Sequence, residues 1–139
     1  MTQISTPKLE FRIPNKNELD LNGFLFYGAR LIGKSIVSPV LLDKKLRGLF
    51  PEYIHELFLE DISVKSELRG NGFGSYLLEK TLDVPRQAGK IVLVEPSPDK
   101  GKTLDLDALF RFYQRHGFVR FDDPRFKDYL LFNPLVNYK

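Results

Sequence analysis

The sequence contains no cysteine and only two histidines, His55 and His116. The absence of cysteine excludes a disulfide framework, a thiolate metal site and a cysteine nucleophile. Two histidines are too few for most zinc sites unless carboxylates complete the ligand set. We therefore expect no metal site, and any catalysis has to proceed without a covalent thiol intermediate.

Long apolar runs and a large excess of one charge are also missing. No run approaches the roughly 20 residues of a membrane span, and the start, MTQISTPKLEF, lacks the basic and apolar regions of a signal peptide. Lys plus Arg total 21 against 18 Asp plus Glu, and the net charge of +3 is not gathered in a block. A nucleic-acid partner is therefore not expected. These features predict a cytoplasmic protein without a membrane partner.

The 139 residues are 42% hydrophobic and 28% charged, a composition typical of a globular protein. A chain of this length can bury about two-thirds of its unfolded surface without a metal or disulfide. We expect one domain over residues 1–139.

The spacing of apolar residues predicts a mixed α/β domain. Strands are predicted at residues 9–13, 23–27, 53–64, 90–95, 118–121 and 129–132. Residues 23–42 read as a hairpin with its turn near residues 30–34, and residues 43–50 as a basic loop or single helical turn. One helix should follow Phe73 and end or kink at Pro85, and another should run from Leu106 to a cap at Gly117.

Strict alternation in the strand at residues 53–64 would separate its two carboxylates. Glu60, Ile62 and Val64 would share one face. The other face would carry Leu57, Leu59, Asp61 and Ser63.

A first glycine motif, Gly28-Ala-Arg-Leu-Ile-Gly33-Lys34-Ser35, matches the phosphate-loop pattern G-x-x-x-x-G-K-[ST]. A helix must follow the lysine of a phosphate loop, but the β-branched pair before Pro39 disfavours one here. The run Leu57-Phe-Leu-Glu-Asp61 could still supply the acidic strand that such enzymes need. A phosphate-loop nucleotide hydrolase is therefore a weaker alternative to a plain hairpin.

A second motif, Arg69-Gly70-Asn71-Gly72-Phe73-Gly74, follows a predicted strand and opens a predicted helix. Its glycines let the backbone turn sharply, and several N–H groups at a helix N-terminus can then point at one anion such as a pyrophosphate. The spacing differs from the G-x-G-x-x-G of a dinucleotide fold. A glycine-rich connector without a ligand is the alternative.

Two motifs in register resemble the GNAT superfamily of acetyl-CoA-dependent N-acetyltransferases. Arg69, Gly72 and Gly74 match its first signature, Gln or Arg, two residues, Gly, one residue, Gly or Ala, after the strand residues 62–64. The second, F-Y-x-x-x-G-F, is matched by residues 112–118. The likeness covers residues 53–121 and implies a mostly antiparallel central sheet flanked by helices.

The resemblance also implies acetyl-CoA as co-substrate and assigns roles to residues. The backbone of Ile62, Ser63 and Val64 would bind pantetheine. The pyrophosphate would lie on the turn formed by Arg69, Gly70, Asn71, Gly72, Phe73, Gly74 and Ser75. Tyr113 would protonate the leaving thiolate, since a phenol with a pKa of about 10 keeps its proton at neutral pH.

An ammonium acceptor must lose a proton before it attacks, so a carboxylate or a water held by one is needed. Glu60 is the favoured base or water-holder and Asp61 the alternative; either could also be a solvated strand carboxylate. Leu59-Glu60-Asp61 resembles the polyamine and thialysine acetyltransferase branch, where acidic residues on this strand contact the amine.

Two departures from the family bear on the site. The asparagine that often precedes the tyrosine by seven residues is Leu106 here, between Asp105 and Asp107. The family also often carries two helices between its first two strands, whereas residues 14–22 hold about two turns at most. This shortened region implies an acceptor site that is open, suiting a protein lysine or N-terminus, or that is completed by another chain.

The sequence thus predicts an N-acetyltransferase that moves an acetyl group from acetyl-CoA to a primary amine, in a small molecule or a protein, by direct attack in a ternary complex. An inactive module of this fold that binds acyl-CoA or a protein is the alternative. A homodimer through residues 129–132 is a further hypothesis.

Overall fold

The computed structural model describes residues 8–14, 21–97 and 105–135. Within them, seven strands form one sheet in the order β1-β2-β3-β4-β5-β7-β6. The strands are β1 (Leu9–Arg12), β2 (Gly23–Tyr27), β3 (Arg30–Pro39), β4 (Leu57–Val64), β5 (Val92–Val94), β6 (Val119–Arg120) and β7 (Leu130–Phe132). Among these described strands, only β4 and β5 pair in parallel. The mixed, mostly antiparallel sheet is confirmed.

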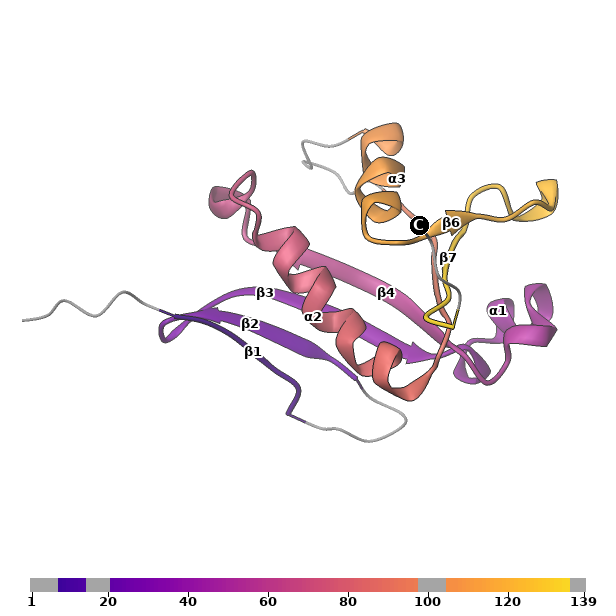
Figure 1. Ribbon diagram of the computed structural model, residues 1–139, viewed down its shortest axis with the longest axis horizontal. Helices are drawn as coiled ribbons and strands as arrows, with labels where there is room; N and C mark the ends of the chain where they lie inside the picture. The colour runs from indigo at the N-terminus through magenta and orange to yellow at the C-terminus, as the bar shows by residue number, and fades with distance from the viewer. Residues whose placement is uncertain (1–7, 15–20, 98–104, 136–139) are drawn as a thin grey trace, which may run out of the picture.

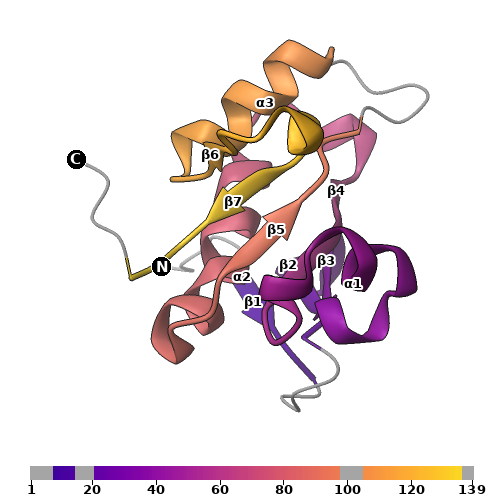
Figure 2. The same cartoon turned by 90° about the vertical axis from the view of Figure 1, so that its right-hand side faces the viewer.

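Helices cover both faces of the sheet. The helices are α1 (Lys44–Leu49), α2 (Phe73–Ala88) and α3 (Leu106–Arg115). α2 crosses the sheet (Figure 1), and α2 and α3 share one core cluster with Leu57, Leu59 and Val92. The turn and helix around Phe50 form another cluster with Leu93, whose side chain points to the opposite face. Figure 2 shows β5 and β7 side by side, with α3 beside them.

The turn of the β2–β3 hairpin lies earlier than predicted. Tyr27 already pairs with Arg30, so the turn is Gly28-Ala29, and the residues expected to form it belong to β3. Gly28 adopts a φ of 63°, a left-handed conformation that glycine takes without strain. The turn therefore forms at the glycine, while Leu31 and Ile32 keep the extended conformation that β-branched and apolar residues favour.

The strand predicted from residue 53 begins only at Leu57 and contains a β-bulge. Pro51–Tyr53 form a 3₁₀ turn, which proline at its first position favours. Asp61 pairs with Ile36 and Leu59 with Val37, so Glu60 is the extra residue of β4. A bulge shifts the alternation by one residue. The predicted faces were therefore wrong: Leu57 and Leu59 lie on the same side as Ile62 and Val64.

α2 continues past Pro85, where we had predicted an end or a kink, and stops at Gly89. Proline removes one backbone donor, but Pro85 is buried in the helix face and its packing keeps the helix intact. Gly89 has a φ of 67°, and the amide of Lys90 donates to the Pro85 carbonyl at 2.9 Å. A left-handed glycine with such a bond is the usual end of a helix.

The connection between β1 and β2 bears on the expected shortening of the helical region between the first two strands. β1 ends at Arg12 and β2 begins at Gly23, which leaves too few residues between them for two helices of ordinary length, about 11 residues each. Positions 15–20 of that connection lie outside the described residues.

β7, which contains most of the segment expected to form a dimer, is paired with β5 on one side and β6 on the other. A dimer that adds strands at a free edge cannot use β7, because both of its edges are already paired.

Candidate active site

The two parallel strands β4 and β5 separate part-way along the sheet. Their pairing runs from Leu57 with Val92 to Leu59 with Val94, and there β5 ends while β4 continues to Val64. Among the described residues, the rest of β4 pairs with β3 alone. The other edge of residues 60–64 therefore offers backbone N–H and C=O groups to whatever lies beside it.

A cavity of about 360 Å³ lies at this separation, bordered by β4, the end of β5, the start of α2 and α3. It brings together most residues that the sequence singled out. These are Glu60, Ile62, Ser63, Val64, Arg69, Gly70, Gly72, Gly74, Ser75 and Tyr113. Two residues predicted at the site do not border it, Asn71 and Phe73.

The turn before α2 depends on two left-handed glycines. Gly70 has a φ of 84° and Gly72 a φ of 81°, and a Cβ at either position would meet no atom within 4 Å. Backbone conformation therefore requires glycine here, and open space lies in front of the turn. Arg69 Nε donates to the Val64 carbonyl at 3.2 Å, and Asn71 Nδ2 donates to the Leu68 carbonyl at 3.1 Å. These bonds hold the turn, which explains why Asn71 faces away from the cavity.

Phe73 also faces away from the cavity. Its ring packs on that of Tyr27 at 6.1 Å and joins the core cluster beneath α2. The first turn of the helix thus has one apolar residue anchored in the core, while its backbone borders the open turn.

The N-terminus of α2 has no side-chain cap, unlike the starts of α1 and α3. Asp43 accepts from the Leu46 amide and Asp105 from the Ala108 amide, whereas Gly72 has no side chain with which to cap α2. The first intrahelical bond is that of the Tyr76 amide to the Gly72 carbonyl, at 3.1 Å. The amides before it are left for an external acceptor, and the helix dipole favours an anion there.

Tyr113 lies on the inner face of α3 and is 5% exposed. Burial raises the pKa of its phenol well above the ordinary value of about 10, and the negative charge of Asp61 raises it further. A phenol that stays protonated at neutral pH thus borders the cavity.

The two carboxylates of β4 both border the cavity, although strict alternation had separated them. The bulge at Glu60 is the reason, because it breaks that alternation. Glu60 is exposed, whereas Asp61 is half-buried with its Oδ2 3.5 Å from Ser63 Oγ. The Glu60 carboxylate is therefore open to solvent, while the charge of Asp61 raises the pKa of Tyr113.

Several residues at the site were missed by the sequence reasoning. Val94, Glu95 and Ser97 border the cavity at the carboxyl end of β5, and Leu109 and Phe112 border it from α3. The end of a parallel strand is where α/β sheets bind ligands, so the predicted strand at residues 90–95 carried a usable signal. Leu106 does not border the cavity, and Asp105 is the cap of α3.

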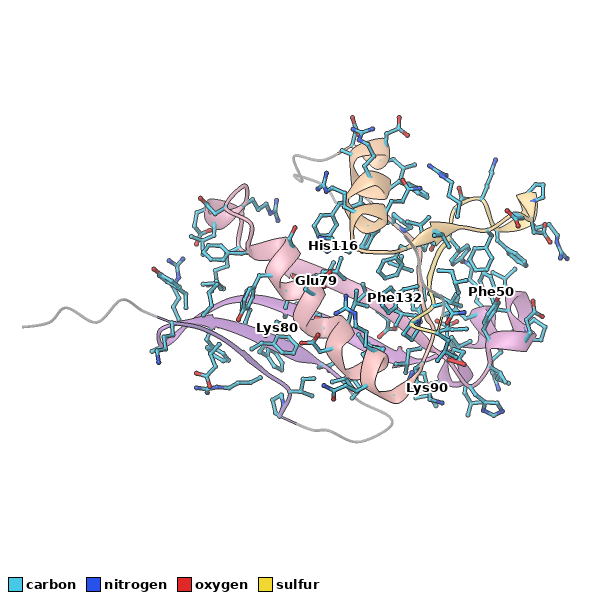
Figure 3. The ribbon with its side chains drawn as sticks, in the orientation of Figure 1. Phe50, Glu79, Lys80, Lys90, His116 and Phe132 are labelled. Carbon is cyan, nitrogen blue, oxygen red and sulfur yellow. The ribbon has the colours of Figure 1, made fainter. Side chains whose placement is uncertain are left out.

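His116 also has contacts that its sequence position did not predict. His116 is the C-cap residue of α3, and its ring reaches α2 (Figure 3). Its Nδ1 lies 2.5 Å from Glu79 Oε2 and its Nε2 lies 3.2 Å from Ser75 Oγ. Glu79 and Ser75 precede His116 by 37 and 41 positions in the chain, so no local sequence pattern reveals these contacts.

The phosphate-loop alternative was wrong. Ser35 has no exposed surface and its hydroxyl bonds with that of Thr81 at 2.8 Å, so it cannot ligate Mg²⁺. Gly33 is required by packing, because a Cβ there would lie 3.0 Å from the Ser63 carbonyl oxygen. Lys34 lies in the middle of β3, and no helix follows it.

No helix among the described residues has the length and apolar character needed to cross a bilayer.

Comparisons with solved structures agree with this architecture. The ribosomal-protein-S18-alanine N-acetyltransferase from Escherichia coli is 17% identical, with a TM-score of 0.60 over 89% of this chain and 75% of that one. The anti-CRISPR protein AcrVA5 is 18% identical, with a TM-score of 0.55 over 73% and 90%. A mutant AtaT toxin bound to the C-terminus of the antitoxin AtaR and acetyl-CoA is 16% identical, with a TM-score of 0.57 over 83% and 67%. These identities support the fold alone.

A comparison with sequence families goes further. No curated protein matches the sequence. A family model described as an acetyltransferase (GNAT) domain matches residues 26–120, which include β3, β4, the glycine turn, α2 and α3. The chain therefore belongs to the GNAT family of acetyltransferases.

Proposed function

We propose that the protein transfers an acetyl group from acetyl-CoA to a primary amine by direct attack in a ternary complex. The separation of β4 from β5 beyond the Leu59–Val94 pair is the observation that carries this proposal. It creates a cavity with an uncapped helix N-terminus at one side and the phenol of Tyr113 at another. The AtaT structure, a neighbour with bound acetyl-CoA, supports the choice of co-substrate.

Acetyl-CoA fits the groups that border the cavity. The amides of pantetheine can pair with the free edge of β4 as an added strand would. The diphosphate can accept from the amides at the start of α2, where Gly70 and Gly72 leave space in front of the turn. The thioester then extends along β4 toward Tyr113 and the carboxylates.

The residues around the thioester divide the proton transfers between them. Glu60 accepts the proton of the ammonium through water, which frees the amine to attack the thioester carbon. Asp61 helps to keep Tyr113 protonated, and the phenol donates a hydrogen bond to the departing sulfur. A thiol has an ordinary pKa of about 8.5, far below that of this phenol, so hydrogen bonding is favoured over complete transfer of the phenolic proton.

We further propose that the acceptor amine belongs to a protein or peptide. The connection between β1 and β2 is too short for two helices that could wall the acceptor side. The S18-alanine N-acetyltransferase shares this fold and, as its name states, acts on an alanine of a ribosomal protein. An open acceptor side suits a bulky acceptor.

The test combines a thermal melt with a turnover assay. Acetyl-CoA at 100 times its Kd should stabilise the protein by about 2.7 kcal/mol, whereas Mg²⁺-ATP should not. Release of the coenzyme thiol is then followed with diamines, lysine peptides and peptides with free N-termini. Stabilisation without turnover on any amine would identify an inactive acyl-CoA-binding module. No stabilisation by acetyl-CoA would contradict the proposal.

A further inference from the structure

Three side chains form a hydrogen-bonded chain from the edge of the cavity into the contact between α2 and α3. Ser75 Oγ lies 3.2 Å from His116 Nε2, and His116 Nδ1 lies 2.5 Å from Glu79 Oε2. Figure 3 shows His116 beside Glu79 at the point where α3 ends against α2. The His116 side chain is only 13% exposed, so water competes weakly for these bonds.

The position of the protons in this chain follows from Glu79. Partial burial alone would raise the pKa of Glu79, but the hydrogen bonds and charges of Arg86 and His116 outweigh burial and lower it. Its Oε1 accepts from Arg86 Nη2 at 2.7 Å and its Oε2 faces His116. An ionised carboxylate only accepts hydrogen bonds, so His116 Nδ1 must carry a proton.

The protonation state of the ring then decides what the Ser75 hydroxyl can do. In the neutral ring Nε2 is an acceptor, so the Ser75 hydroxyl donates its only proton to His116 and has only lone pairs left for other partners. In the protonated ring Nε2 is a donor, so Ser75 accepts from His116 and its own proton is free. Ser75 borders the cavity in the first turn of α2, beside the uncapped amides.

We propose that His116 is a positioning residue that directs the Ser75 hydroxyl, so that the protein binds the diphosphate of coenzyme A more tightly when His116 is protonated. This inference rests on the proposed use of acetyl-CoA and adds a pH dependence to it. Histidine ionises between about pH 5 and 8, so the change falls in a physiological range.

The other charged groups around His116 do not offer an equivalent change. Arg86, from α2, bonds both Glu79 and Asp83, and its guanidinium lies over the Phe132 ring of β7. On α3, Arg115 precedes His116 and the ring of Phe112 packs against it at 5.3 Å. The carboxylates and guanidinium groups keep one charge state from pH 5.5 to 8.5. Among these types of side chain, the imidazole is the one whose ordinary pKa lies in that range.

The ligand for the test is dephospho-coenzyme A, which has the diphosphate but lacks the 3′-phosphate. A phosphate monoester itself ionises near pH 6 and would add its own pH dependence. The Kd is measured by calorimetry from pH 5.5 to 8.5 for the wild-type protein, Ser75→Ala, Ser75→Thr and His116→Gln. A hydrogen bond to a charged acceptor changes an affinity by about tenfold or more.

We expect the wild-type Kd to be about tenfold lower at pH 5.5 than at pH 8.5. Ser75→Thr keeps the hydroxyl and should keep this ratio, whereas Ser75→Ala should lose most of it and His116→Gln all of it. The same pH dependence in Ser75→Ala as in the wild type would overturn the inference, since the imidazolium charge would then act without the hydroxyl. A wild-type Kd that does not vary with pH would overturn it too.

Nitrogen NMR of the imidazoles gives a ligand-free check that does not depend on the variants' binding. The neutral His116 ring should carry its proton on Nδ1, and a proton on Nε2 would overturn the inference. The other histidine, His55, gives its own imidazole signals, and the signals that disappear in His116→Gln are those of His116. Absence of binding to any variant at any pH is a different failure, because it would contradict the proposed use of acetyl-CoA and the inference together.

Discussion

Asp61 on β4 and Tyr113 on α3 border the same cavity, and the charge of Asp61 acts on the Tyr113 phenol. Burial and this charge both disfavour the phenolate. The pair therefore keeps a hydrogen-bond donor available at the place where a leaving thiolate needs one. This relationship yields two predictions, one for the rate and one for stability.

Replacing Tyr113 by phenylalanine should lower kcat about 100-fold and leave the Kd of acetyl-CoA unchanged, since a positioned hydrogen-bond donor to a developing negative charge contributes a factor of about 10² or more. Tyr76→Phe is the matched control, because Tyr76 does not border the cavity and its ring contacts Lys80. Steady-state kinetics and calorimetry measure the two quantities. A Tyr113→Phe enzyme with wild-type kcat would remove the proposed role.

The same tyrosine should make the protein lose stability at alkaline pH. The unfolded chain gives up the phenolic proton at about pH 10, while the folded protein holds it to higher pH. The stability that this difference contributes is complete below pH 10 and is lost as the pH rises above it, by up to about 1.4 kcal/mol per pH unit. Urea unfolding from pH 8 to 11.5 should show a smaller loss in Tyr113→Phe. Equal losses would contradict the buried, protonated phenol.

Glu60→Gln should lower kcat at neutral pH and should recover part of it at alkaline pH, where more of the amine is already unprotonated. The comparison with Asp61→Asn separates the two carboxylates, because Asp61→Asn should instead lower the pKa of Tyr113. The pH–rate profiles of both variants give the answer. A normal rate in Glu60→Gln with a strongly reduced one in Asp61→Asn would assign the base to Asp61.

Gly72→Ala should destabilise the protein by about 1–2 kcal/mol, because alanine is strained at a left-handed φ of 81°. It should also weaken acetyl-CoA binding by disturbing the start of α2. Gly48→Ala is the control: Gly48 lies in α1, and a Cβ there meets no atom within 4 Å. That change should be neutral or stabilising. Equal effects of the two substitutions on unfolding would argue against the strained turn.

The buried Ser35–Thr81 pair predicts that substitutions at these two positions will not be additive in their effects on the free energy of unfolding. Thr81→Val leaves the Ser35 hydroxyl without its partner in a site with no exposed surface, at a cost of about 1–3 kcal/mol. Combining it with Ser35→Ala removes the stranded group and should recover part of that stability. Urea unfolding of the four proteins in a double-mutant cycle measures the coupling. Additive effects would show that the bond contributes nothing.

Local sequence patterns predicted the elements that depend on local chemistry. The glycine turn followed by α2 was identified because Gly70 and Gly72 are needed for its backbone, and α3 because its apolar residues recur at helical spacing. Pattern reasoning failed where distant segments decide the outcome. The bulge at Glu60 arises from the register between β3 and β4, and alternation within β4 contains no sign of it.

The candidate site shows the same division. Tyr113 and the glycine turn were found from motifs, whereas the contacts of His116 with Ser75 and Glu79 arise only when α3 packs on α2. Asp105 had a local explanation, since an aspartate before an apolar helical run is a common cap. β5 is shorter than the strand predicted at residues 90–95, because its pairing with β4 covers only Val92–Val94.

The position of β7 has a consequence for how the protein is made. β7 follows β5 and β6 along the chain but lies between them in the sheet. A nascent chain that stops short of residue 130 therefore exposes the apolar edge of β5, which is an aggregation hazard. Leu130 and Phe132 also complete the cluster that contains Val94 and Tyr113. We expect the wall of the cavity to be assembled only after residues 130–132 have left the ribosome.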